Sequence, residues 1–256
     1  MPILNETLLP GAVPRWEIPG WRERFGVSAG ITGRGSGPTP FDLGLSTDQP
    51  VGEVLNRWRA LMASEPGFQA HVFGRQVHGN VVRLQEGGEG WIQIEGVDGH
   101  VTTTPGVMLY VSAADCIPIY LVSPKHRAIA LLHAGWRGVA GGILERGLEA
   151  LYQHSKATPV DVIMHCGVGI CGGCYEVEHE VFDSLGLPPG PGDRGRGQLD
   201  LRQVLADWAK QCRIQDVSVS EFCSSHDGER FFSHRGSGGR GGRMVAFLGL
   251  LPFDSK

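Results

Sequence analysis

The sequence predicts one domain of mixed α/β or α+β class. The chain has 256 residues, of which 41% are hydrophobic and 20% charged, which is ordinary for a soluble protein with a sizeable core. Short apolar runs typical of strands interleave with amphipathic runs typical of helices. There is no internal repeat, and the Gly/Pro-rich loop at 186–197 is too short to mark a boundary. We therefore expect a single domain over 1–256.

The strands and helices follow from local patterns. Residues 50–65 place apolar side chains at helical spacing and end before a proline, so they predict a helix. Amphipathic runs predict three more helices, at 139–154, 175–186 and 199–212. Apolar runs bounded by turn residues predict strands within 28–45, 70–84, 107–123, 128–135, 160–170, 217–225 and 244–251. In the 70–84 segment a turn is expected around His78–Asn80.

Charge and hydropathy limit the location and the partners. A formal net charge of −4 disfavours non-specific nucleic-acid binding. No apolar run approaches the ~18 residues that a membrane span needs, and the first residues lack the pattern of a signal peptide. We therefore expect a cytoplasmic protein, either a monomer or a small homo-oligomer, with no nucleic-acid or membrane partner.

The six cysteines do not predict disulfides, which are improbable in a cytosolic chain. Cys171 and Cys174 form a C-x-x-C motif, but a structural zinc site usually needs a second pair at similar spacing, and we find none. His165 and Cys166 lie nearby and are the alternative partners for a local site. We expect these thiols to pack beside glycines in a tight turn.

Three strand-like runs end in a polar residue beside small neighbours. They end at His78 in "RQVHGN", Cys116 in "SAADCIPI" and His133 in "LLHAGWRG". The gaps between these residues are too long for a zinc finger, but they suit ligands that separate strands deliver to one cleft. Two imidazoles and one thiolate suit Zn²⁺ or copper, and three protein ligands leave the open position that a catalytic metal needs. A packing role for each residue alone remains the alternative.

The motifs "QVHG", "ADCIPI", "HAGWRG", "CYEV" and "FFSHR" resemble the signatures of the YfiH-like, or laccase-domain, family, over about residues 28–250. The resemblance implies a layered α/β fold with mixed sheets, likened to the catalytic domain of the cytotoxic necrotizing factors. It also implies that His78, Cys116 and His133 are the metal ligands. Members of the family have been described as polyphenol oxidases and as purine nucleoside phosphorylases with adenosine deaminase activity.

The resemblance predicts a zinc-dependent purine nucleoside phosphorylase that acts on adenosine, inosine and methylthioadenosine and also deaminates adenosine. Its partners would be a small-molecule nucleoside and phosphate. Arg137 is the leading candidate for the phosphate clamp, because a guanidinium fork matches phosphate oxygens. Arg34 and Arg235 match two further arginines of the family pattern, and Gln76 is grouped with these substrate-binding residues. An ion-pair role is the alternative for each arginine.

Two further residues flank the proposed ligands. Asp115 precedes Cys116 and is a candidate to orient a ligand histidine or to carry a proton, although it would equally cap a turn. Trp136 is large enough to stack on a purine, and packing is its alternative role.

Other functions stay open at this stage. Cys116 and His133 would also suit a metal-free thiol hydrolase or deamidase, although such a dyad has no obvious use for His78. The chain has no H-x-H motif, which disfavours a multicopper mechanism, but one copper would fit the His-Cys-His site of a polyphenol oxidase. A non-catalytic metal-stabilised protein and a factor that edits peptidoglycan precursors are the remaining alternatives.

Overall fold

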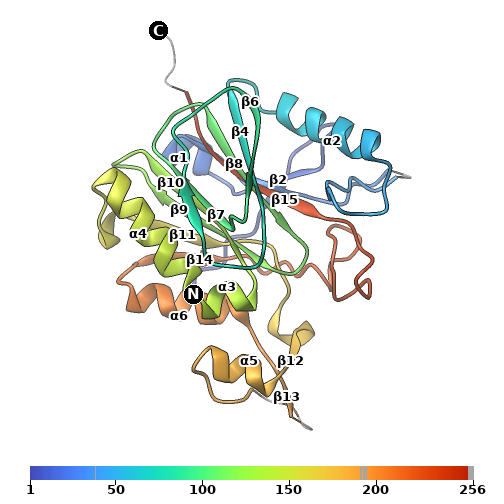
Figure 1. Ribbon diagram of the computed structural model, residues 1–256, viewed down its shortest axis with the longest axis vertical. Helices are drawn as coiled ribbons and strands as arrows, with labels where there is room; N and C mark the ends of the chain where they lie inside the picture. The colour runs from blue at the N-terminus through green and yellow to red at the C-terminus, as the bar shows by residue number, and fades with distance from the viewer. Residues whose placement is uncertain (38, 191, 193–194, 253–256) are drawn as a thin grey trace.

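Two β-sheets stack face to face in the computed structural model, which describes residues 1–37, 39–190, 192 and 195–252 (Figure 1). The first sheet has seven strands in the order β1 (Thr7–Leu8), β2 (Arg15–Glu17), β3 (Val27–Thr32), β15 (Met244–Leu250), β8 (Val107–Ala113), β4 (Ala70–Arg75) and β6 (Gly90–Glu95). The second has six, in the order β14 (Asp216–Val219), β11 (Ile163–Cys166), β9 (Ile117–Ser123), β10 (Ala128–Ala134), β7 (Gly99–Thr102) and β5 (Val82–Leu84). Both sheets mix parallel and antiparallel pairs, which confirms the predicted class.

Helices cover the outer faces of the two sheets and complete a four-layer arrangement. The helices are α1 (Trp21–Phe25), α2 (Val51–Ala63), α3 (Trp136–Ala140), α4 (Ile143–Ser155), α5 (His179–Ser184) and α6 (Leu201–Gln211), with 3-10 turns η1 (Pro159–Asp161) and η2 (Gly172–Cys174). Helix α2 packs Trp58 on the first sheet, while α4 and α6 pack Leu148 and Leu205 on the second. Among the described residues, no helix combines the length and the apolar character that crossing a membrane requires.

Strand β10 shows how the sequence builds these layers. Successive side chains of a strand point to opposite faces, so Ile129 and Leu131 join the core between the sheets, whereas Ala130 and Leu132 pack under α4. The whole strand is buried, which explains its continuous apolar run. Its buried His133 lies near the strand's last residue, at an edge where the two sheets meet the solvent.

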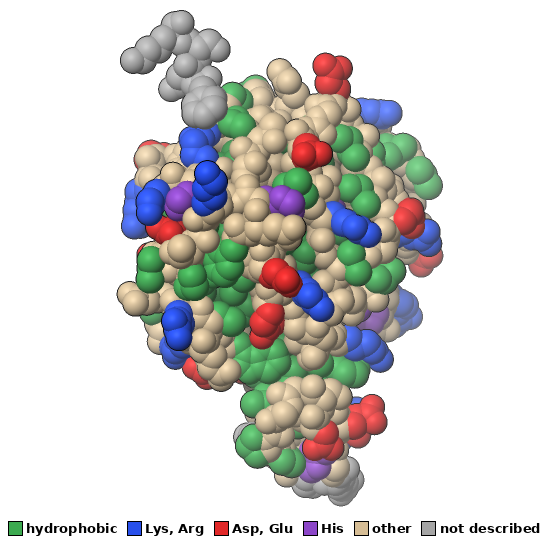
Figure 2. Space-filling view, turned by 60° about the vertical axis from the view of Figure 1, so that its left-hand side comes forward, with side chains coloured by type: hydrophobic (Ala, Val, Ile, Leu, Met, Phe, Trp, Pro, Cys, Tyr) green, Lys and Arg blue, Asp and Glu red, His purple; other side chains and the backbone are tan. Residues whose placement is uncertain are grey.

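The structure differs from the sequence-based elements in several segments. The elements β1, β2, α1, β6 and β7 lie outside the expected ranges, and two expected helices differ from the prediction. The helix expected over 139–154 is two helices, α3 and α4, because Gly142 adopts a left-handed conformation between them. The helix expected over 175–186 is α5 alone, since Glu176–Glu178 forms strand β12, which pairs with β13 (Arg196–Gln198) in the segment expected to be a loop. Together β12, α5 and β13 form a lobe that projects from the body (Figures 1 and 2).

Candidate functional site

Three strand ends bring His78, Cys116 and His133 together. His78 follows β4, Cys116 lies between β8 and β9, and His133 belongs to β10. Their ligand atoms all lie within 4.8 Å of one another, and the centroids of the two imidazole rings are 4.9 Å apart. We call these three residues the cavity cluster. The arrangement combines one sulfur and two ring nitrogens, a donor set that suits zinc or copper.

Glycine lets the chain pass close to the cavity cluster. A Cβ atom at Gly135 would lie 3.0 Å from the Cys116 sulfur and 3.2 Å from the His78 ring, so a side chain there would press on both ligands. At Gly138 it would lie 2.7 Å from the carbonyl oxygen of Gly79. These two glycines of the "HAGWRG" motif therefore allow the turn into α3 to pack against the His78 loop.

Asp98 organises the cavity cluster from beneath, and the sequence analysis missed it. Its buried carboxylate accepts hydrogen bonds from the backbone N–H groups of Val77, His78 and Gly79, at 2.9 to 3.1 Å. The same carboxylate lies 2.9 Å from Nδ1 of His133. One residue thus fixes the His78 loop and orients His133 with Nε2 free for a ligand. The signal available in the sequence was an aspartate directly before the Gly99–Thr102 strand.

The charges around the cavity cluster favour a cation. Burial raises the pKa of Cys116, but the charges and hydrogen bonds of His133 and His78 outweigh it and lower this pKa to about 6. Burial lowers the pKa of His133, but Cys116 and Asp98 outweigh it and raise that pKa to about 9. Burial also raises the pKa of Asp98, yet its bonds to His133, Gly79 and Val77 bring it below the ordinary value. Both shifts favour a Cys116 thiolate beside His133, and the thiolate is the form of cysteine that binds metals.

The cavity cluster opens into a cavity of about 920 Å³. Every predicted site residue except Arg34 lines it: Gln76, His78, Asp115, Cys116, His133, Trp136, Arg137 and Arg235. Tyr175, which lies in the quoted motif "CYEV", and Arg243, which directly precedes β15, line it too, although neither is among the predicted site residues. The volume accommodates a ligand of nucleoside size together with an anion.

Among the arginines that line the cavity, Arg137 and Arg235 are held differently. Arg137 is exposed, with its guanidinium carbon 4.3 Å from the centroid of the Trp136 ring. Trp136 itself is half-buried and packs on the core beneath α4, so packing accounts for part of its surface. Arg235 donates from Nη1 to the carbonyl oxygen of Glu176 at 2.7 Å and lies 5.3 Å from the centroid of the Tyr175 ring. Both residues are exposed, but the guanidinium of Arg235 is bonded to a backbone carbonyl.

Gln76 and Asp115 line the cavity but are engaged by their own chain. The Gln76 amide bonds the backbone of Ser112 in both directions, at 2.9 and 2.7 Å, and joins the ends of β4 and β8. The Asp115 carboxylate accepts from Ser224 Oγ and from the Arg235 N–H, both at 2.6 Å. The predicted orienting contact to a ligand histidine thus belongs to Asp98, while Asp115 ties two loops to the wall of the cavity.

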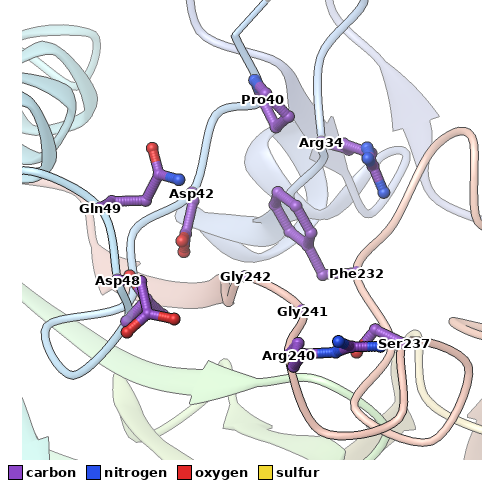
Figure 3. A pocket seen from close by; sticks show the side chains of 11 residues that line it. Arg34, Pro40, Asp42, Asp48, Gln49, Phe232, Ser237, Arg240, Gly241 and Gly242 are labelled. Atoms are coloured by element: carbon purple, nitrogen blue, oxygen red, sulfur yellow. The ribbon is translucent and has the colours of Figure 1, made fainter.

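Arg34 lies at a different place. It lines a smaller cavity of about 280 Å³ with Asp42, Phe232 and Arg240 (Figure 3). Its guanidinium carbon is 5.3 Å from the centroid of the Phe232 ring. The structure does not include Arg34 in the lining of the larger cavity, because the loop after β3 directs it to the Phe232 segment instead.

The expectation that Cys171 and Cys174 have no second ligand pair is wrong. Their sulfurs group with Cys223 and His226, a C-x-x-H pair that the sequence analysis overlooked. The alternative partners lie elsewhere: His165 bonds Ser218 and Glu6 inside the protein. Cys166 is fully buried, and burial raises its pKa to about 12, so it is a packing residue.

The chain is similar to known proteins over most of its length. Residues 24–251 match the model of a family described as multi-copper polyphenol oxidoreductase laccase. The purine nucleoside phosphorylase YlmD of Geobacillus stearothermophilus is 36% identical over 248 residues, covering 88% of this chain and 90% of the relative. The purine nucleoside phosphorylase of Deinococcus radiodurans is 39% identical over 238 residues, covering 88% and 85%.

Solved structures share the fold. The crystal structure of YlmD from Geobacillus stearothermophilus superposes with a TM-score of 0.85 at 30% identity, covering 96% of this chain and 100% of that one. The hypothetical protein YfiH of Bacillus licheniformis superposes with a TM-score of 0.86 at 25% identity, covering 95% and 99%. The stacked sheets therefore belong to an established architecture.

Proposed function

Because the chain belongs to the family described as multi-copper polyphenol oxidoreductase laccase, we propose that it is a metal-dependent purine nucleoside phosphorylase of the kind named among its relatives. The substrates proposed are adenosine, inosine and methylthioadenosine, and the metal proposed is zinc. The single observation that carries the proposal is the cavity cluster, backed by Asp98, in a cavity whose wall includes an accessible arginine.

Phosphorolysis sets clear requirements for the cavity. The C1′–N9 bond of the nucleoside breaks, a C1′–O bond to phosphate forms, and the purine leaves with the electron pair and gains a proton. The products are the free base and ribose 1-phosphate. An enzyme must therefore hold phosphate against C1′ and stabilise the departing purine.

Positively charged side chains on the wall of the cavity suit the binding of phosphate. Arg137 is accessible and suits a phosphate oxygen pair, because its planar fork matches the anion. Arg235 adds a second positive charge on the same wall. Burial, together with the charge of Cys116, raises the pKa of Tyr175 to about 12, so its hydroxyl stays protonated and able to donate a hydrogen bond.

A metal held by His78, Cys116 and His133 would supply Lewis acidity at its open coordination position. The chain's own contribution is to hold these three donors rigid through Asp98 and Gly135. Trp136 lines the cavity, and its aromatic ring is available there for contact with the purine.

Adenosine deamination is the second activity that we assign to this cavity. A three-residue ligand set leaves one coordination position open, and the cavity is large enough to admit water beside a nucleoside. In that reaction water replaces the exocyclic amine of adenosine, so that inosine and ammonia form.

The test combines metal analysis with product analysis. Purified protein is incubated with each nucleoside and phosphate, and free base and ribose 1-phosphate are quantified; adenosine without phosphate reports inosine. We expect metal-dependent phosphorolysis that is lost in Cys116→Ala and retained in the matched control Cys212→Ser. Turnover of an amide by metal-free protein would instead identify a thiol hydrolase. A copper-loaded protein that oxidises phenols but leaves nucleosides intact would identify the oxidase.

A further inference from the structure

Two loops meet beside the cavity and bring a second set of metal-binding side chains together. Cys171 and Cys174 lie on the loop after β11, and Cys223 and His226 lie on the loop after β14. The parallel pairing of β11 with β14 delivers both loops to the same edge of the second sheet. A bridge between Gly169 and Cys223 continues that pairing into the loops. The four side chains, here called the loop cluster, are thus held together by the fold.

The distances within the loop cluster match a tetrahedral metal site. Its three sulfurs and one ring nitrogen all lie within 4.8 Å of one another. With Zn–S bonds of about 2.3 Å and Zn–N bonds of about 2.0 Å, ligands at tetrahedral corners lie about 3.6 to 3.8 Å apart. The measured separation of Cys171 Sγ and His226 Nδ1 is 3.6 Å.

Backbone groups already support a thiolate at Cys223. The N–H groups of Cys171 and His226 point at its sulfur, at 3.3 and 3.4 Å. The Asp227 carboxylate accepts from the Cys223 N–H at 2.9 Å and fixes the turn that carries the pair. Hydrogen bonds of this kind orient and stabilise the ligands of metal sites.

We infer that Cys171, Cys174, Cys223 and His226 bind a structural zinc ion, separate from the metal of the cavity cluster. Three thiolates and one imidazole are a closed ligand set, which is typical of structural rather than catalytic zinc. The spacing, C-x-x-C followed by C-x-x-H, is that of zinc-binding turns. Soft thiolates also select zinc over magnesium or calcium.

The loop cluster is positioned to hold the wall of the cavity. Cys174 directly precedes Tyr175, which lines the cavity, and Cys223 directly precedes Ser224, which donates to Asp115 at 2.6 Å. A zinc ion here would cross-link two loops that already contain the short turn η2 and are joined by the Gly169–Cys223 bridge. It would therefore keep Tyr175 and Asp115 in place without touching substrate.

The first experiment counts zinc in the full chain purified under reducing conditions. We expect two zinc ions per wild-type chain and one per chain of Cys116→Ala, because only the cavity cluster is damaged. Cys174→Ser and His226→Ala each lose the other zinc and keep the first. The matched controls are Cys212→Ser and His154→Ala, which change a half-buried cysteine and an exposed histidine outside both clusters and should retain two.

The second experiment identifies the ligands by spectroscopy, with a readout that does not depend on activity. Cobalt is titrated into metal-depleted Cys116→Ala protein. Tetrahedral cobalt absorption with thiolate-to-cobalt charge-transfer bands is expected, and the intensity of these bands should fall sharply when the protein also carries Cys174→Ser. A Cys116→Ala protein with neither zinc nor cobalt absorption overturns the inference, as does a disulfide among Cys171, Cys174 and Cys223 in the reduced preparation. Because these readouts are independent of turnover, a failure of the proposed activity leaves them unaffected.

Discussion

The cavity cluster and the loop cluster use the same two residue types but differ in number and support. His78, Cys116 and His133 stand at strand ends, rest on the buried carboxylate of Asp98 and face a cavity. The loop cluster has four donors on two loops, with backbone N–H groups as its supports. Three donors leave a coordination position for a substrate, whereas four close the metal off. Under the two proposals above, one extra ligand is what distinguishes the structural site from the reactive one.

The largest effect should come from the cavity cluster itself. Cys116→Ala removes the only sulfur donor of that cluster and with it several kcal/mol of transition-state stabilisation, so kcat/KM for phosphorolysis should fall on the order of 10³-fold. Steady-state kinetics with inosine and phosphate measure this. Activity within tenfold of wild type would show that the cavity metal has no part in the reaction.

The carboxylate beneath the cavity cluster should have the next largest effect. Asp98→Asn keeps the shape but removes the charge that holds His133, and metal affinity of the cavity cluster should fall about 10- to 100-fold. Competition with a chromogenic chelator measures this affinity in a Cys174→Ser background, which isolates the cavity cluster. An unchanged dissociation constant would mean that Asp98 stabilises the His78 loop but does not contribute to metal binding through His133.

Substitution of Arg137 or of Arg34 should show which of the two cavities binds phosphate. Arg137→Ala removes a charged hydrogen bond of about 1.5 kcal/mol, which should raise KM for phosphate about tenfold while the zinc content stays constant. Arg34→Ala, in the smaller cavity, should leave KM for phosphate unchanged. If the two variants behave in the opposite way, the assignment of the phosphate site is wrong.

The smallest effect on turnover is expected from the loop cluster. Cys174→Ser should lower the melting temperature by about 5 °C, because a ligand bound only to the folded state no longer adds to stability. The value of kcat should fall only a few-fold, through a looser Tyr175 and Asp115. Differential scanning calorimetry with and without added zinc measures this, and Cys212→Ser is the control. A Cys174→Ser protein that melts like wild type would refute the stabilising role.

Sequence alone identified the residues whose local pattern is distinctive. His78, Cys116 and His133 each end an apolar run, and their motifs match a known family, so their convergence could be anticipated. The role of Asp98 could not be predicted in this way, because it depends on three N–H groups of a loop about twenty residues earlier. Such a contact has no local signature in the sequence.

Pairing between distant segments explains why the loop cluster and strand β12 were not predicted. Cys171 and Cys223 are 52 residues apart, and only the parallel pairing of β11 with β14 brings them together. The sequence of β12 is compatible with both the helical and the strand period, because the run before α5 is short. Only its pairing with β13 identifies it as a strand. In each case the deciding contact comes from a distant segment of the chain.

Finally, the cavity cluster draws its donors from both sheets. His78 follows a strand of the first sheet, His133 belongs to the second, and Cys116 lies on the link between them. A metal bound to the cavity cluster would join the two sheets at their shared edge. The affinity of the cluster for the metal would then depend on how the sheets are aligned. Replacing Leu131, deep between the sheets, would then weaken metal binding at a distance through a slight sliding of one sheet over the other. If the cavity cluster binds a metal as proposed, its affinity would thus depend on the packing of the core.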